Sequence, residues 1–133
     1  MIELVWVDER DAIALHDRLL ALHGGGQGTR DLGLLQSALA RPRQMLAYAS
    51  DSDVITLSAA YTVGIVKNHP FIDGNKRTGF VVGVLFLESN GFRFTATEED
   101  AARAILSLAA GTLTEESFIL FLRENSVQTA LCK

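Results

Sequence analysis

The chain has 133 residues, 48% of them hydrophobic, which is the usual size of one domain and enough to bury a core. Sixteen acidic residues against twelve basic ones give a net charge of -4, so the chain lacks the overall basic field of a nucleic-acid-binding protein. Its single cysteine, Cys132, excludes an internal disulfide framework and indicates a reducing compartment.

Neither a membrane span nor a secretion signal is evident. The longest apolar run, GFVVGVLFL, ends before Glu88 and is far shorter than the roughly 20 residues needed to cross a bilayer. The segment MIELVWVDERDAIAL carries acidic residues where a signal peptide would be positively charged. With no repeat or low-complexity linker, these features predict a cytoplasmic protein with one domain over residues 1–133.

Helical periodicity begins near the N-terminus. The first predicted helix spans about residues 9–23, with Asp8 as its N-cap and a run of glycines after it. The second begins after Asp31. It is predicted to be short, because Pro42 cannot donate a main-chain hydrogen bond and should end it.

The third and fourth helices are predicted to form a buried hairpin at the centre of the domain. The third starts at Ser52 or Asp53 and runs to about Lys67, and Pro70 is expected to hold the residue before it in an extended conformation. The fourth covers about residues 75–89 and is apolar on nearly every face, which places it in the middle of a bundle.

Two further helices are predicted in the last third of the chain, with Thr97 and Thr114 at their starts. The FRF segment at residues 92–94 is expected to be briefly extended. The sequence therefore predicts an all-α fold, with six helices in one compact domain.

The stretch NHPFIDGNKRTGF, residues 68–80, concentrates ionic side chains between the two most apolar helices. Its first part is the predicted turn, and the fourth helix begins at Asn75. The unpaired N–H groups of a helix N-terminus attract anions, and Lys76 and Arg77 add two positive charges there. Cations in a first turn oppose the helix dipole, at a cost of about 0.3 to 1 kcal/mol each, and a bound phosphate would remove this conflict.

The other residues of this stretch suit the same ligand. Gly74 lets the main chain approach a phosphate closely, and Asn75 offers an amide donor. Asp73 is a hard oxygen ligand suited to the magnesium that accompanies a nucleoside triphosphate. His69 can take a proton at neutral pH, as phosphoryl or nucleotidyl transfer requires, and Phe71 is expected to be an apolar anchor.

The segment HPFIDGNKR resembles the signature H-x-F-x-D/E-G/A-N-x-R of the Fic/Doc superfamily. The matching positions are His69, Phe71, Asp73, Gly74, Asn75 and Arg77. Lys76 stands where Fic proteins carry a second glycine, which is the mark of the Doc branch, the death-on-curing toxins of toxin–antitoxin pairs. GTRDLGLLQSALARP, AAYTVGIVKNHPF and FLESNG are similar to the rest of a Doc-type domain, so the resemblance covers about residues 8–125.

The resemblance implies ATP and Mg²⁺ as cofactors and gives each motif residue a role. These roles are general base for His69, magnesium ligand for Asp73, anion-hole donors for Asn75 and the Gly74 main chain, and phosphate clamps for Lys76 and Arg77. In Doc relatives the γ-phosphate is transferred to a threonine of translation elongation factor Tu, which stops protein synthesis, whereas Fic relatives transfer AMP. Phe80 stands where the Fic motif usually has a further arginine, which favours the kinase.

The resemblance also predicts a partner. Fic proteins that restrain themselves carry an inhibitory helix with the pattern Ser/Thr-x-x-x-Glu-Gly/Asn, and the nearest segment here, TATEED, ends in Asp100. We therefore expect inhibition by a small antitoxin whose disordered segment folds on this chain.

Each motif residue also has a purely structural interpretation. These are a helix C-cap for His69, a turn pair for Asp73 and Gly74, an N-cap for Asn75, and a solvated basic pair for Lys76 and Arg77. Three function classes therefore stay open: a Doc-type protein kinase toxin, a Fic-type AMP transferase, and a helical interaction module with an inactive site.

Features outside the motif carry less functional information. His16 and His23 lie about 10 Å apart along the first helix, too far to share a zinc ion, and are predicted to be surface or boundary residues. GGGQGT lacks the last glycine of a dinucleotide fingerprint and is expected to be a flexible connection. In relatives the region of GQGTRD is a flap that registers a target chain, which makes Arg30 and Asp31 candidates for that role.

Overall fold

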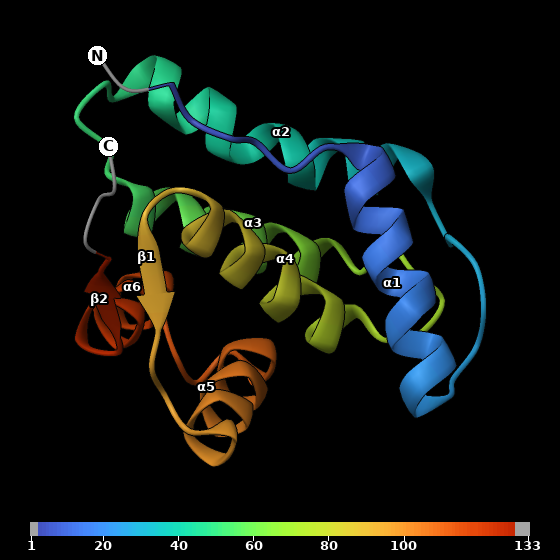
Figure 1. Ribbon diagram of the computed structural model, residues 1–133. Coiled ribbons are helices and arrows are strands. Elements are labelled where there is room, and N and C mark those ends of the chain that lie inside the picture. The colour runs from blue at the N-terminus through green and yellow to red at the C-terminus, as the bar shows by residue number, and fades with distance from the viewer. Residues whose placement is uncertain (1–2, 130–133) are drawn as a thin grey trace.

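The computed structural model describes residues 3–129, so Cys132 lies outside the described part of the chain. Over these residues the chain forms six helices and one two-stranded sheet. Their order is α1 (Glu9–His23), α2 (Leu32–Tyr48), α3 (Val54–Asn68), α4 (Asn75–Ser89), β1 (Phe92–Phe94), α5 (Glu98–Ala110), α6 (Glu115–Glu124) and β2 (Ser126–Gln128). The predicted all-α, six-helix architecture is confirmed, with α3 and α4 side by side at its centre (Figure 1).

The helix starts follow the predicted capping residues. Each of the following side chains accepts a hydrogen bond from a main-chain N–H in the first turn of its helix: Asp8, Asp31, Asp53, Thr97 and Thr114. The predicted bounds of α1 and α4 match the observed ones. The FRF segment is β1, and it pairs antiparallel with β2, which the sequence analysis did not predict.

The second helix is longer than predicted, because α2 passes through Pro42 and ends only at Tyr48. An interior proline cannot donate to the carbonyl four residues earlier, here Ala38, and costs about 3 kcal/mol relative to alanine. Pro42 is itself buried, and Ala38 lies so close to α3 that a Cβ on Gly64 would stand 3.2 Å from its carbonyl oxygen. The packing of α2 on α3 therefore overrides the local preference on which the prediction rested.

The two central helices run antiparallel and approach very closely. The Thr62 hydroxyl donates to the Gly79 carbonyl at 2.8 Å, and the Ser58 hydroxyl donates to the Gly83 carbonyl at 2.7 Å. A Cβ on Gly83 would collide with the Thr62 hydroxyl, and one on Gly79 would lie 3.0 Å from a Val66 methyl group. The two glycines on α4 thus make room for α3, and two hydroxyls of α3 fasten the helices together.

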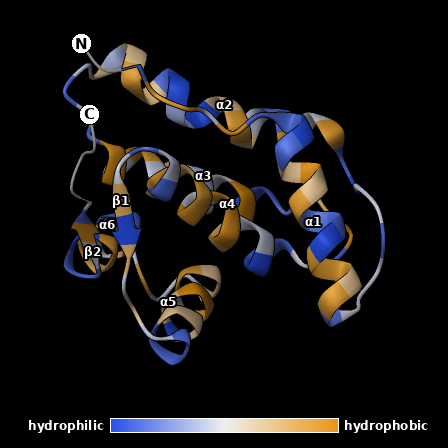
Figure 2. Cartoon of the chain, in the orientation of Figure 1, coloured by the Kyte–Doolittle hydropathy of each residue, from blue (hydrophilic) through white to orange (hydrophobic). Residues whose placement is uncertain are grey.

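Of the two central helices, α3 is more completely buried than α4. Residues Ile55 and Leu57–Val66 of α3 are all buried, whereas Leu85 of α4 is 37% exposed. In Figure 2 the hydrophobic colour dominates α3 and much of α4, while α1 and α2 alternate between hydrophobic and hydrophilic patches. Within residues 3–129, no helix is both long and apolar enough to cross a membrane.

Replacement of Gly83 tests the close approach of α3 and α4. Gly83→Ala should lower the free energy of unfolding by about 1 to 3 kcal/mol, because the added methyl group has no space beside Thr62. The measurement is chemical denaturation followed by circular dichroism. The control is Gly33→Ala in the exposed first turn of α2, where the change should stay within about 1 kcal/mol. Equal stability of the Gly83→Ala and wild-type chains would contradict the packing described here.

Candidate active site

The motif residues lie in the loop between α3 and α4 and in the first turn of α4. His69 ends α3 with φ 57° and ψ 51°, and it is the one non-glycine residue with positive φ in the described chain. The prediction of an extended conformation is therefore wrong. A following proline disfavours the right-handed helical region, and His69 satisfies this restriction in the left-handed region, where its N–H still donates to the Ile65 carbonyl at 3.0 Å. This turn leaves the His69 imidazole exposed.

Arg30 fixes the end of α3 from outside. Its guanidinium donates from Nε to the His69 carbonyl at 2.9 Å and from Nη2 to the Asn68 carbonyl at 3.1 Å. These carbonyls lie at the negative end of the helix dipole, so a cation is favourable there. Arg30 thereby holds the main chain of His69 in place.

The glycine-rich sequence predicted a flexible connection after α1. Instead, segment 28–31 is held against the motif loop by main-chain hydrogen bonds. Thr29 and Phe71 form an antiparallel bridge. The N–H groups of Arg30 and Asp31 donate to the Pro70 carbonyl at 2.7 and 3.0 Å, and further along the loop Ile72 donates to Gly28. This main-chain pairing ties the region predicted to be a flap to the loop that carries His69.

Asn75 holds the loop from inside. Its side chain is 4% exposed, accepts from the Phe71 N–H at 2.8 Å and donates to the Phe71 carbonyl at 2.9 Å. Its Nδ2 also lies 3.4 Å from Nδ1 of His69, at the outer limit of a hydrogen bond. The interpretation of Asn75 as an N-cap is wrong, because Gly74 occupies that position with φ 79°. The Asn75 amide positions Phe71 and borders the His69 ring.

Asp73 presents an exposed carboxylate whose oxygens are both oriented. Oδ2 accepts from the Gly26 N–H at 3.2 Å, and Oδ1 accepts from the Gly74 N–H at 2.8 Å. The hydrogen bond from Gly26, followed by that from Gly74, holds the pKa of the Asp73 carboxyl below its usual value, so it is ionised at neutral pH. A Cβ on Gly25 would lie 2.9 Å from Oδ2, so glycine at that position also keeps the space around the carboxylate free.

The exposed carboxylate of Asp73 fits magnesium better than a metal ion that takes all its ligands from the protein. Among residues 3–129 there is no group of three or more His, Cys, Asp or Glu side chains arranged to hold a metal ion. Magnesium bound with a nucleotide needs only one or two protein carboxylates, since phosphates and water complete its octahedron. Asp73 is the motif carboxylate that would hold it.

Lys76 and Arg77 are exposed in the first turn of α4, and neither forms an ion pair within the described chain. They border an apolar groove between α4 and α5 with a volume of about 330 Å³. Its other lining residues are Phe80, Glu98, Ala101, Ala102, Ile105 and Leu106. The two cations therefore stay available to an anion at the N-terminus of α4.

His16 joins the site although it was predicted to be a surface or boundary residue. It is 1% exposed, its ring stacks on Phe71 with centroids 3.8 Å apart, and its Nε2 lies 2.8 Å from the Asp73 carbonyl oxygen. Its position four residues after the buried Ala12 puts it on the inner face of α1, and this spacing was the signal available in the sequence. His23 is exposed, as predicted.

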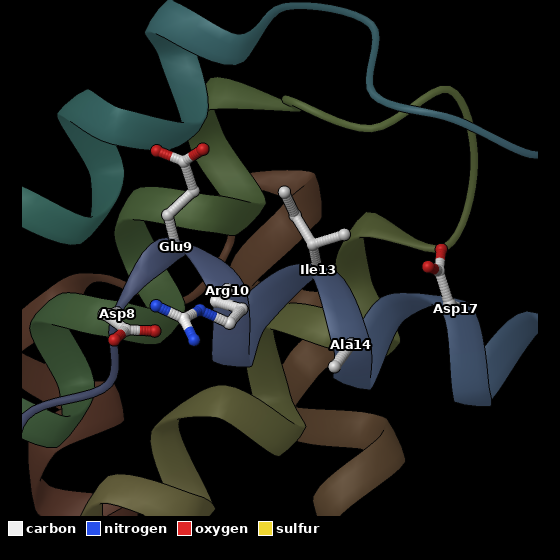
Figure 3. A pocket seen from close by; sticks show the side chains of 6 residues that line it. All are labelled: Asp8, Glu9, Arg10, Ile13, Ala14 and Asp17. Atoms are coloured by element: carbon white, nitrogen blue, oxygen red, sulfur yellow. The ribbon is translucent and has the colours of Figure 1, made fainter.

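A larger hollow, of about 640 Å³, lies along α1 (Figure 3). Its lining residues are Asp8, Glu9, Arg10, Ile13, Ala14 and Asp17. None of them belongs to the motif, and Asp8 is engaged as the N-cap of α1. The residues for which the sequence predicts chemistry therefore lie on and next to the α3–α4 loop and do not line this hollow.

Replacement of Asn75 tests whether its amide holds the loop. Asn75→Ala would leave the buried N–H and carbonyl of Phe71 without partners, at an expected cost of about 1 to 3 kcal/mol in the free energy of unfolding. The control is Thr78→Val one turn later, because the Thr78 hydroxyl is buried and has no partner within the described chain. That variant should keep or gain stability. An Asn75→Ala chain as stable as the wild type in urea titration would show that Asn75 does not hold Phe71.

Known proteins with similar sequences belong to the family whose motif this chain carries. The sequence model described as the Fic/DOC family matches residues 6–87. The chain is 32% identical over 110 residues to "Protein kinase doc" of Escherichia phage P1, which covers 83% of both chains. It is 39% identical over 75 residues to "Toxin Doc" of Mycolicibacterium smegmatis, covering 55% of this chain and 57% of that relative. With its motif on the loop between two central antiparallel helices, the chain belongs to the Fic/Doc family.

Proposed function

We propose that the chain is a Doc-type toxin that transfers the γ-phosphate of ATP to a hydroxyl side chain of a protein. The observation that carries this proposal is the pair of exposed cations, Lys76 and Arg77, at the N-terminus of α4. They form no ion pair within residues 3–129, and the motif places them close to His69 and to the ionised Asp73. The names of the two relatives, a protein kinase and a toxin, support it.

Each of these groups has a proposed task in the transfer. The N–H groups at the start of α4, with Lys76 and Arg77, would bind the phosphate oxygens and neutralise their charge. His69 would take the proton as the target oxygen attacks the γ-phosphorus, while the bond to the bridging oxygen breaks and ADP leaves. Asp73 would hold Mg²⁺, which supplies charge neutralisation on the phosphates when bound. Arg30 and Asn75 keep the His69 main chain and its neighbours in register during this step.

A Fic-type AMP transferase is the second candidate, and the residue that argues against it is Lys76. A glycine at this position leaves room for two phosphates side by side, whereas the lysine stem occupies that space. Phe80 in place of a further arginine removes a second cation that AMP transfer would use. The nucleotide is therefore proposed to present its γ-phosphate to His69.

The proposed target is a translation factor, with elongation factor Tu as the first to test, so that protein synthesis in the cytoplasm stops. The segment 28–31, already paired with the His69 loop, would lie beside the incoming chain. Control is proposed to come from a separate small antitoxin with a disordered segment, because the inhibitory pattern of self-restrained Fic proteins is missing from the sequence.

Labelled ATP tests the proposal directly. The wild-type chain, incubated with cell lysate, should transfer label from the γ-phosphate and not from the α-phosphate. His69→Ala should reduce the transfer about 10²- to 10⁴-fold, because the general base is lost. The control is His23→Ala, which removes an exposed histidine of α1 and should retain full transfer. Transfer of the α-label would favour the AMP transferase, and transfer of neither label would support the inactive interaction module.

A second test concerns Lys76. Lys76→Gly should reduce γ-phosphate transfer and allow some AMP transfer, while costing at most about 1 kcal/mol of stability at an exposed first-turn position. Lys76→Ala serves as the control, because it removes the charge without the backbone freedom of glycine. If folded Lys76→Gly protein kept wild-type γ-phosphate transfer, this lysine would not set the orientation of the nucleotide.

A further inference from the structure

We propose that His16 is a positioning residue that holds the main chain of Asp73 so that its carboxylate meets magnesium at a fixed place. This inference rests on the proposed function, since it assumes that Asp73 holds the magnesium of a nucleotide. It concerns a residue outside the motif, on α1, which is 57 positions away from Asp73 in the sequence.

The donor and the acceptor in the contact between His16 and Asp73 can be assigned. Nε2 lies 2.8 Å from the Asp73 carbonyl oxygen. A carbonyl oxygen can only accept, so Nε2 carries the proton and donates it. The ring is 1% exposed and stacks on Phe71 at an interplanar angle of 8°, and a Cβ on Gly74 would lie 3.7 Å from the ring. The imidazole is therefore packed on Phe71 and close to Gly74, which leaves it little freedom to rotate.

A histidine at this buried position is explained by the hydrogen bond rather than by packing. Leucine or phenylalanine would fill an inner face of α1 at lower cost, because burial of a polar ring is unfavourable unless the ring is paired. The ring nitrogen opposite the donor, Nδ1, lies 3.7 Å from a carboxylate oxygen of Asp17, whose side chain is 70% exposed. The hydrogen-bond partner of the ring is therefore the Asp73 carbonyl.

Asp73 depends on this contact more than its neighbours in the loop do. The carbonyls of Asn68 to Phe71 accept from Arg30, Asp31 or Asn75. Within residues 3–129 the Asp73 carbonyl has one donor, which is His16. The carboxylate itself is exposed, and within the same residues it is oriented by the N–H groups of Gly26 and Gly74. Loss of the His16 bond should therefore loosen the carboxylate while the His69 side of the loop stays fixed.

Two substitutions separate the hydrogen bond from the packing. His16→Phe keeps a flat ring on Phe71 but removes the donor. His16→Gln keeps a donor at similar reach and should rescue the function. His23→Phe is the matched control, with the same change at an exposed histidine of the same helix. Circular dichroism and thermal unfolding establish that each variant is folded.

The first readout is the affinity for a non-hydrolysable ATP analogue, measured by titration calorimetry with and without Mg²⁺. In His16→Phe the gain in affinity from Mg²⁺ should fall by roughly tenfold or more, as is usual when a group that orients a metal ligand is lost. Affinity without Mg²⁺ should not change, and His16→Gln and His23→Phe should behave like the wild type. If Mg²⁺ raised the affinity of His16→Phe for the analogue as much as that of the wild type, this inference alone would be overturned. If Mg²⁺ did not change the affinity of the wild-type chain, the proposed function would be overturned as well.

The second readout needs neither nucleotide nor activity. Amide hydrogen exchange at Gly26, which donates to the Asp73 carboxylate, should be several-fold faster in His16→Phe than in the wild type and the control. Nitrogen NMR of the wild-type ring should find the proton of His16 on Nε2, and this measurement decides the matter even where His16→Phe does not fold. A proton on Nδ1 alone, or unchanged exchange at Gly26, would overturn the proposal.

Discussion

The structure depends on the close approach of α3 and α4. Gly79 and Gly83 remove the side chains that would separate the two helices, and hydroxyls of Ser58 and Thr62 fasten them. Because the helices are joined by a short loop, their spacing also fixes the distance that this loop must span. The end of α3 and the start of α4 thus come together at one end of the core, where the carbonyl end of one helix and the N–H end of the other face the same loop.

The motif contains buried residues that support the loop and exposed residues that are accessible to a ligand. Phe71 and Asn75 point inward and are buried, and they attach the loop to the core. The exposed residues of the motif are His69, Asp73, Lys76 and Arg77. Support also comes from segments far away in sequence, since Arg30 holds one end of the loop and His16 the other. Side chains of Arg30, Asn75 and His16 thus hold the main chain of the loop by hydrogen bonds, while the exposed side chains of the motif stay accessible.

Features that depend on neighbouring residues could be predicted from the sequence, and features that depend on distant ones could not. Asp8 and Thr97 mark helix starts because a capping side chain bonds the main chain three residues later. Pro42 was misread because the packing that keeps α2 intact comes from α3. The environment of His16 depends on the α3–α4 loop folding back over α1, which no local pattern around that residue describes. The motif was predictable because its residues are contiguous in the sequence, whereas the residues that support it, such as Arg30 and His16, come from distant segments.

The loop carries a positive region, formed by Lys76 and Arg77, and a negative one, formed by the carboxylate of Asp73. At the N-terminus of α4, Lys76 and Arg77 add positive charge to the positive end of the helix dipole, which by itself disfavours them, and neither has an ion-pair partner among residues 3–129. At Asp73, hydrogen bonds from two main-chain N–H groups, and after them the nearby charges of Lys76 and Arg77, hold the pKa of the carboxyl below its usual value and keep it ionised. A ligand that carries only negative charge would be attracted by the positive region and repelled by the Asp73 carboxylate. A nucleotide with its magnesium ion, which is the ligand we propose, presents both signs together and would match both regions of the loop.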